Sequence, residues 1–175
     1  MPIDADGEIV ASRGSCTSMG ALIALVTLVA DQAHKFYMLE VVGMAPGVRI
    51  AVTDFMNYVY AINKGISYGW LQLDSQAGQY GLAGFAVVAS VVLAVWLTRA
   101  TGRLLGASLG LIIGGAIGNA IDRVRIGGVF DYIQLHAGGF SWYIFNIADV
   151  AIVVGVVGIL ADSLIFGRKT AANAS

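Results

Sequence analysis

The chain has 175 residues, of which 58% are hydrophobic and only 12% are charged, and its mean hydropathy is +0.79. Soluble domains carry about twice that charged fraction, so the composition predicts an α-helical protein that crosses a membrane several times. The formal net charge of -1 provides no basic surface for nucleic acid. The single cysteine, Cys16, excludes an intrachain disulfide, and we interpret it as an incidental free thiol.

The first 18 residues are polar and predict a tail outside the membrane. An apolar run follows from residue 19 to about residue 38, and it is long enough to span a bilayer only if Asp31, His34 and Lys35 lie at its far end. Its core also resembles the apolar part of a secretory leader. Further apolar runs follow, and ionisable residues stand where a cleavage region would have to be. We therefore interpret this run as the first transmembrane helix.

Residues 39–80 mix polar and aromatic side chains and predict an extramembrane, β-rich segment that lies on the bilayer. Residues 48–52 and 55–61 have strand-like content, and Asn63-Lys-Gly65 is typical of a turn. Three further spans are predicted at 81–97, 104–121 and 142–166, joined by loops at 98–103 and 123–141. The whole membrane domain is thus 19–166, with a second tail at 167–175.

Four spans place both termini on the same side of the membrane. Basic residues are equally numerous on the two sides, so a raw count does not decide the orientation. The basic residues in the loop 98–103 and in the C-terminal tail lie in short flanks without offsetting acids. We therefore predict that both termini are cytoplasmic.

One face of the third predicted span is made of glycine. A glycine recurs there at intervals of four, at Gly106, Gly110, Gly114 and Gly118. Such a stripe lets a neighbouring helix backbone approach closely. We interpret it as a packing seam that holds the residues at the end of this span, Asn119 and Asp122, against a partner helix.

The pattern Asn-x-x-Asp occurs twice, as Asn119 and Asp122 near the end of the third span and as Asn146 and Asp149 in the fourth. Residues three apart share a helix face. One copy alone is explained equally well by helix-end chemistry, with Asn146 as an N-cap. Two copies joined by a loop that carries Asp131 favour a function, because ionisable groups at membrane depth are costly. Converging carboxylates suit general acid/base chemistry on a water.

Two further patterns can be explained without a catalytic role. Asp31 and Lys35 are four apart and predict an ion pair on one helix, with a structural role and a substrate-binding role equally favoured. The stretch 65–69 matches the serine-hydrolase pattern G-x-S-x-G, but that pattern requires a strand-to-helix elbow in an α/β sheet. We therefore predict that Ser67 is not a nucleophile.

The chain resembles the lipoprotein signal peptidases, the bacterial signal peptidase II family, over residues 21–164. Five motifs carry the resemblance in the right order and spacing: Asp31-Gln-Ala-His-Lys35, Asn63-Lys-Gly65, Gly114-Gly-Ala-Ile-Gly-Asn-Ala-Ile-Asp-Arg123, Gly128-Val-Phe-Asp-Tyr-Ile133 and Phe145-Asn-Ile-Ala-Asp149. The chain departs from the family at Ile66-Ser-Tyr68, where Ala-Ala-Phe is frequent, and this puts detailed substrate contacts in doubt.

The resemblance implies four transmembrane helices with a small periplasmic β-cradle and a short periplasmic helix. It implies an inner-membrane aspartic endopeptidase whose active site lies near the periplasmic face. The enzyme would remove the signal peptide of prolipoproteins before a diacylglyceryl-modified cysteine. Such a protein needs no metal and no organic cofactor, its partners are these substrates and membrane lipids, and we expect a monomer.

The family's catalytic dyad maps to Asp131 and Asp149. Its substrate-binding or orienting positions map to Asp31, Lys35, Asn63, Gly65, Asn119, Arg123 and Asn146. Symmetry of the two Asn-x-x-Asp copies would instead pair Asp122 with Asp149. We predict a structural role for Asp122, because the adjacent Arg123 would keep it ionised, whereas no neighbour of Asp131 in the sequence is a cation.

Two other functions remain open. Buried aspartates also relay protons in small proton-linked transporters, although such proteins often contain inverted repeats and the two Asn-x-x-Asp copies are the only sign of one here. A membrane scaffold without catalytic activity is the other alternative.

Overall fold

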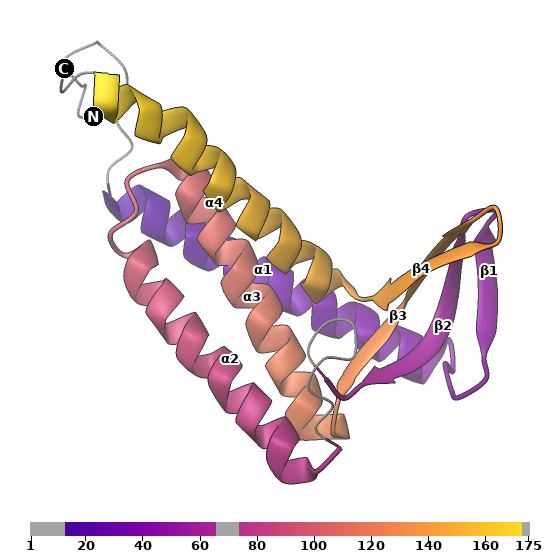
Figure 1. The fold of residues 1–175 in the computed structure, drawn as a ribbon. Helices are drawn as coiled ribbons and strands as arrows, with labels where there is room; N and C mark the ends of the chain where they lie inside the picture. Colours follow the sequence, from indigo (N-terminus) through magenta and orange to yellow (C-terminus); the bar gives the residue numbers. More distant parts are fainter. Residues whose placement is uncertain (1–12, 66–73, 173–175) are drawn as a thin grey trace.

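The computed structural model describes residues 13–65 and 74–172, which form a helical bundle with a small sheet at one end (Figure 1). The four long helices are α1 (Arg13–Phe36), α2 (Gln76–Leu97), α3 (Arg103–Ile126) and α4 (Ile147–Ala172). All four are long and apolar enough to cross a membrane, which confirms the predicted fold class. The start of α1 and the end of α4 lie at the end of the bundle opposite the sheet.

Several boundaries differ from those predicted. The second helix begins at Gln76 and not at residue 81, and the prediction of a loop over 123–141 is wrong, because Val129–Ala137 form a strand. The first helix begins at Arg13, within the predicted polar tail, and the third continues to Ile126. The predicted start of the fourth span at Trp142 is wrong, because this residue belongs to a strand and α4 begins at Ile147. Aromatic and β-branched residues occur both in strands and at span ends, so a short apolar run of this kind is ambiguous in sequence.

The sheet has four antiparallel strands in the order β1-β2-β3-β4. Their bounds are Arg49–Thr53, Met56–Asn63, Val129–Ala137 and Phe140–Phe145. The strands predicted in the 39–80 segment are therefore confirmed as β1 and β2. A π-helical turn, η1 (Tyr37–Val41), continues from α1, and its Met38 packs with Phe130 and Tyr132 in a small core that fastens the sheet to the bundle.

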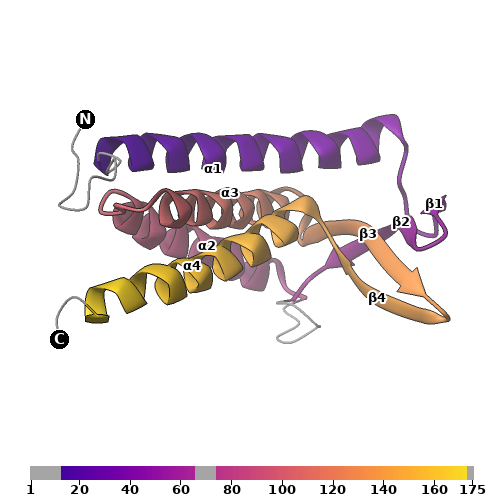
Figure 2. The ribbon, with the colours of Figure 1, turned by 90° about the horizontal axis from the view of Figure 1, so that it is seen from above.

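Helix α3 lies in the middle of the bundle, where it packs against α1, α2 and α4 (Figure 2). The glycine stripe faces α1: a Cβ at Gly110 would collide with the carbonyl oxygen of Gly20, and a Cβ at Gly114 would lie 2.5 Å from that of Ala24. Further along, a Cβ at Gly118 would lie 2.6 Å from an oxygen of Asp31. The predicted packing seam is therefore confirmed, and it brings the polar end of α3 against α1.

The turn after α3 leads directly into the next strand at the sheet end of the bundle. Gly127 ends the helix with a left-handed φ of +71°, and its N–H donates to the carbonyl of Arg123 at 3.2 Å. Glycine adopts this conformation without steric cost and is the usual residue at this position of a helix end. Strand β3 then begins at Val129, and Asp131 thereby lies beside the polar ends of α3 and α4.

Candidate active site

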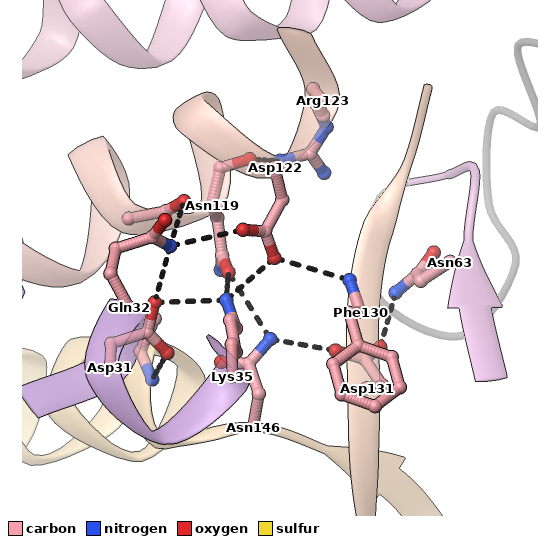
Figure 3. Close-up of polar contacts among 12 residues, drawn as sticks. Asp31, Gln32, Lys35, Asn63, Asn119, Asp122, Arg123, Phe130, Asp131 and Asn146 are labelled. Atoms are coloured by element: carbon pink, nitrogen blue, oxygen red, sulfur yellow. Dashed lines mark hydrogen bonds and ion pairs between the residues drawn. The ribbon is translucent and has the colours of Figure 1, made fainter. Parts of the chain in front are cut away.

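The buried polar groups gather where the sheet meets the bundle (Figure 3). Asp131 lies on β3 opposite Ala61 of β2, next to an irregularity in the register of the two strands. Asp149 lies in the first turn of α4. Sequence-distant segments thus bring the two predicted dyad acids to one junction.

Asp131 is 2% exposed and is bound by amide groups. The Nδ2 of Asn146 donates to its Oδ1 at 2.7 Å, and the Nδ2 of Asn63 donates to its Oδ2 at 3.1 Å. Burial, together with the nearby charge of Asp149, raises the pKa of Asp131 to about 7, against the lowering effect of the two amides and of Lys35. This carboxyl is therefore a group that can hold a proton near neutral pH.

Asn146 and Asp149 cap the start of α4 reciprocally. The Asp149 N–H donates to Oδ1 of Asn146 at 3.0 Å, and the Asn146 N–H donates to Oδ2 of Asp149 at 3.2 Å, which is the geometry of a capping box. The helix-end interpretation of this Asn-x-x-Asp copy is thus confirmed. The same cap leaves Nδ2 of Asn146 to bind Asp131, so one residue fixes the two acids relative to each other.

Asn119 joins this pair to a second group of charges. Its Nδ2 donates to Oδ1 of Asp149 at 2.9 Å. Its Oδ1 accepts from Nδ2 of Asn146 at 3.2 Å and from Nζ of Lys35 at 3.3 Å. Because an amide has one donor end and one acceptor end, these contacts fix its orientation.

Lys35 lies between two carboxylates and is almost completely buried. Its Nζ is 2.9 Å from Oδ2 of Asp31, so the predicted ion pair is confirmed, and 2.7 Å from Oδ2 of Asp122. The cation that balances Asp122 is therefore Lys35 of α1, and the expectation that Arg123 would do so is wrong. Neighbours in a helix sequence point in different directions, whereas α1 packs directly against this face of α3.

The sequence interpretation missed Gln32. Its Nε2 donates to Oδ2 of Asp31 at 3.1 Å, to Oδ1 of Asp122 at 3.0 Å and to the carbonyl of Gly118 at 3.2 Å. Gln32 stands within the first motif, but an amide beside two charged residues carries no distinctive signal in sequence. It is recognised only when α1 and α3 are placed together.

The acids of this second group also hold backbone. The N–H of Ala148 in α4 donates to Oδ1 of Asp31 at 3.0 Å, and the N–H of Phe130 in β3 donates to Oδ2 of Asp122 at 3.2 Å. Each of these backbone groups belongs to the residue immediately before one of the two predicted dyad acids. The carboxylates of Asp31 and Asp122 therefore position the segments that carry Asp131 and Asp149.

Arg123 and Gly65 form the remaining edge of the site. One guanidinium nitrogen of Arg123 donates to the carbonyl of Gly65 and another to that of Asn119, both at 3.2 Å. The Gly65 N–H donates to Oδ1 of Asn63 at 3.0 Å, so the predicted turn is confirmed and is closed by the asparagine side chain. Ser67 lies outside the described residues.

A cleft of about 780 Å³ opens over this junction. Its floor includes Asp131 and the turn at Asn63 and Gly65, and its wall is residues 140–144 of β4. Within residues 13–65 and 74–172, no group of three His, Cys, Asp or Glu side chains is placed to hold a metal ion. His34 stacks on Tyr132, with ring centroids 5.1 Å apart.

The family model described as "Signal peptidase (SPase) II" matches residues 23–165. The chain belongs to the signal peptidase II family. A lipoprotein signal peptidase of Methylocella silvestris is 47% identical over 150 residues, which cover 86% of this chain and 88% of the relative. One of Rhodopseudomonas palustris is 50% identical over 151 residues, which cover 84% and 92%.

The fold of this signal peptidase II family member is also shared with a solved structure. A bacterial membrane enzyme determined by the in meso method matches with a TM-score of 0.73 and 27% identity, over 84% of this chain and 88% of the other. The chain is thus a peptidase and a multipass protein of the inner membrane, and the transporter alternative receives no support.

Proposed function

We propose that this protein is an aspartic endopeptidase that removes the signal peptides of prolipoproteins. The observation that carries the mechanism is the pairing of Asp131 and Asp149 through Asn146, with Asp131 lining an open cleft. Membership of the signal peptidase II family supports the substrate class.

The chemistry follows from placing two acids where both cannot easily ionise, so that the pair retains one proton. The ionised member takes a proton from a water, and this water attacks the peptide carbonyl. The protonated member hydrogen-bonds the carbonyl oxygen and then helps the amine to leave. Asp131 and Asp149 titrate as a unit, and either can begin the cycle as the base.

The amides and cations around the dyad would position it and the substrate. Asn119 and Asn146 hold the two carboxylates, and Asn63 holds Asp131 from the cleft side. Arg123 keeps the turn at Gly65 against α3, where the substrate backbone would pass. No step in this mechanism requires a metal or an organic cofactor.

The arrangement also supports an orientation in the membrane. The sheet lies at one end of the bundle, and the start of α1 and the end of α4 lie at the other (Figure 1). The cleft is lined by residues of the sheet and of the turn that follows β2, so it lies at the sheet end. We assign the cytoplasm to the helix-terminal end and the periplasm to the cleft. A substrate anchored in the bilayer by its signal helix and acyl chains would then present its diacylglyceryl cysteine to the dyad, and a monomer would suffice.

The test is direct. Purified protein in lipid nanodiscs should cut a diacylglyceryl-modified prolipoprotein immediately before the modified cysteine, as measured by mass spectrometry of both products. The same prolipoprotein without the lipid is the matched control and should be cut much more slowly. Failure to cut the lipidated substrate, with the protein folded, would support the scaffold alternative instead.

A further inference from the structure

A buried amide at the start of α2 holds the turn that follows β2. Gln79 is 1% exposed, although the rest of this helix is largely apolar. Its Nε2 donates to the carbonyl oxygen of Lys64 at 2.6 Å. Burial of an amide is costly unless the amide is hydrogen-bonded, so this contact offsets the cost of placing Gln79 here. The contact also ties the backbone of the turn to α2.

The same turn carries the amide that binds Asp131. The Gly65 N–H donates to Oδ1 of Asn63 at 3.0 Å. This leaves Nδ2 of Asn63 to donate to Oδ2 of Asp131 at 3.1 Å (Figure 3). The amide of Asn63 has its acceptor and its donors at different ends, so the position of the turn backbone decides where Nδ2 points. A shift of the backbone at Lys64 would therefore move the donor away from Asp131.

The turn is held from two helices through consecutive carbonyl groups. The carbonyl of Lys64 accepts from Gln79 of α2, and the carbonyl of Gly65 accepts from Arg123 of α3 at 3.2 Å. Gly65 lines the cleft, whereas Gln79 is not among the residues that do so. Gln79 therefore reaches the site through the backbone that it binds.

We propose that Gln79 is a positioning residue for the dyad. By holding the carbonyl of Lys64 against α2, it keeps the amide of Asn63 in place against the carboxyl of Asp131. This inference rests on the proposed function.

The pH dependence of cleavage is a direct readout of this role. The amide of Asn63 lowers the pKa of Asp131, because its hydrogen bond stabilises the ionised carboxyl. A turn released from α2 would weaken that bond, so the pH at which the dyad loses its last proton should rise. The other titratable groups around this contact are Lys35 of α1, Arg123 of α3, Tyr143 of β4 and Asp149 of α4. A neutral substitution at Gln79 removes none of these groups, so a shifted profile reports the Asn63 contact.

The experiment measures kcat and KM against pH for Gln79→Met and Gln79→Leu, with a diacylglyceryl-modified prolipoprotein as the substrate. Both variants keep apolar bulk and lack the donor. The pH-independent kcat should fall by about tenfold or more, because small displacements of reacting groups are costly, and the alkaline limb should move to higher pH. Asn63→Ala removes the donor directly and should move the limb in the same direction. Adding Gln79→Met to Asn63→Ala should move it no further, because both changes act on one contact.

The matched control is Gln76→Met. Gln76 lies three residues earlier in α2, but it is exposed and its amide bonds Tyr80, so this variant should keep the wild-type rate and profile. An unshifted alkaline limb in both Gln79 variants, or a further shift in the double variant, would overturn the positioning role. Loss of the fold in both variants would also overturn it, because Gln79 would then serve stability alone. No cleavage of the lipidated substrate by the wild type would overturn the proposed function instead.

Discussion

Two pairs of carboxylates lie at the junction of the sheet and the bundle, and they are balanced differently. Asp31 and Asp122 share the ammonium group of Lys35, whereas Asp131 and Asp149 receive amide groups of asparagines and, within the described chain, no ion pair. A buried carboxylate beside a cation favours its charged form, but a buried carboxylate beside another carboxylate favours the proton. The same residue type therefore serves structure in one pair and suits proton transfer in the other.

Asn119 is the element that both pairs share. It accepts from Lys35 and donates to Asp149, so the charged pair orients the donor that holds one dyad acid without placing a cation against it. A direct contact with Lys35 would favour ionisation of the dyad and remove the proton that the proposed chemistry needs. The asparagine thus transmits position while keeping Lys35 out of direct contact with Asp149.

The largest expected effect comes from removing either dyad acid. Asp131→Asn and Asp149→Asn keep the shape of the side chain and remove a proton-transfer group, so each should reduce cleavage by about 10³-fold or more. The double variant should be little worse than either single one, because groups that act as a unit are not additive. The measurement is cleavage of a diacylglyceryl-modified prolipoprotein, normalised to folded protein.

Near-normal turnover by Asp131→Asn, with a folded but inactive Asp122→Asn, would show that the two pairs have been assigned the wrong way round.

The next largest effect should come from removing the cation of the structural pair. Lys35→Met leaves Asp31 and Asp122 buried beside each other, and loss of one partner of a buried ion pair destabilises a protein by roughly 3–5 kcal/mol. The measurement is thermal unfolding in detergent. The matched control is Lys64→Met, because Lys64 and Asp74 form an exposed pair at 3.7 Å whose loss should have little effect. Equal, small shifts in both variants would contradict the role assigned to Lys35.

Asp122→Asn should have a smaller effect on stability. The amide keeps an oxygen for the Phe130 N–H but gives up the charge that faces Lys35, so we expect a loss of about 1–2 kcal/mol. Activity per folded molecule should stay within about tenfold of the wild type, because dyad chemistry does not use this group. In the Lys35→Met background the same substitution should cost less, and a double-mutant cycle measures that coupling.

The sequence was sufficient for the helices and for most of the site residues, for physical reasons. Long apolar runs have one common explanation, so all four spans were predicted, and ionisable residues at membrane depth are rare enough to mark a site. The strand at Trp142 was missed because short aromatic runs suit strands and span ends alike. Local patterns were also ambiguous. Asn146 and Asp149 form a helix cap, as the structural interpretation predicted, and the same two residues also belong to the candidate active site.

Contacts between helices were the part that sequence could not supply. We predicted that Arg123, the neighbour of Asp122 in the chain, would balance its charge. In the structure the ion-pair partner of Asp122 is Lys35 of α1. Gln32 was missed for the same reason, since its three acceptors include two on α3. Such pairings depend on the register of α1 against α3, which the glycine stripe makes possible but does not specify residue by residue.

The last expected effect is a pH dependence that separates the two pairs further. In the folded protein the pKa of Asp131 is raised to about 7 from an ordinary value of 3.8. Between these values the folded state binds a proton that the unfolded state has lost, so stability falls as pH rises, by at most about 1.4 kcal/mol per pH unit. Asp131→Asn should remove this contribution. As pH increases from about 5 to 6.5, the melting temperature of this variant should therefore rise relative to that of the wild type. Asp74→Asn is the control, because Asp74 is exposed and its removal should leave the slope as it is in the wild type. Parallel pH profiles for the wild type and Asp131→Asn would show that Asp131 is already ionised in the folded protein, and the contrast between the amide-held and the cation-held pair would then be lost.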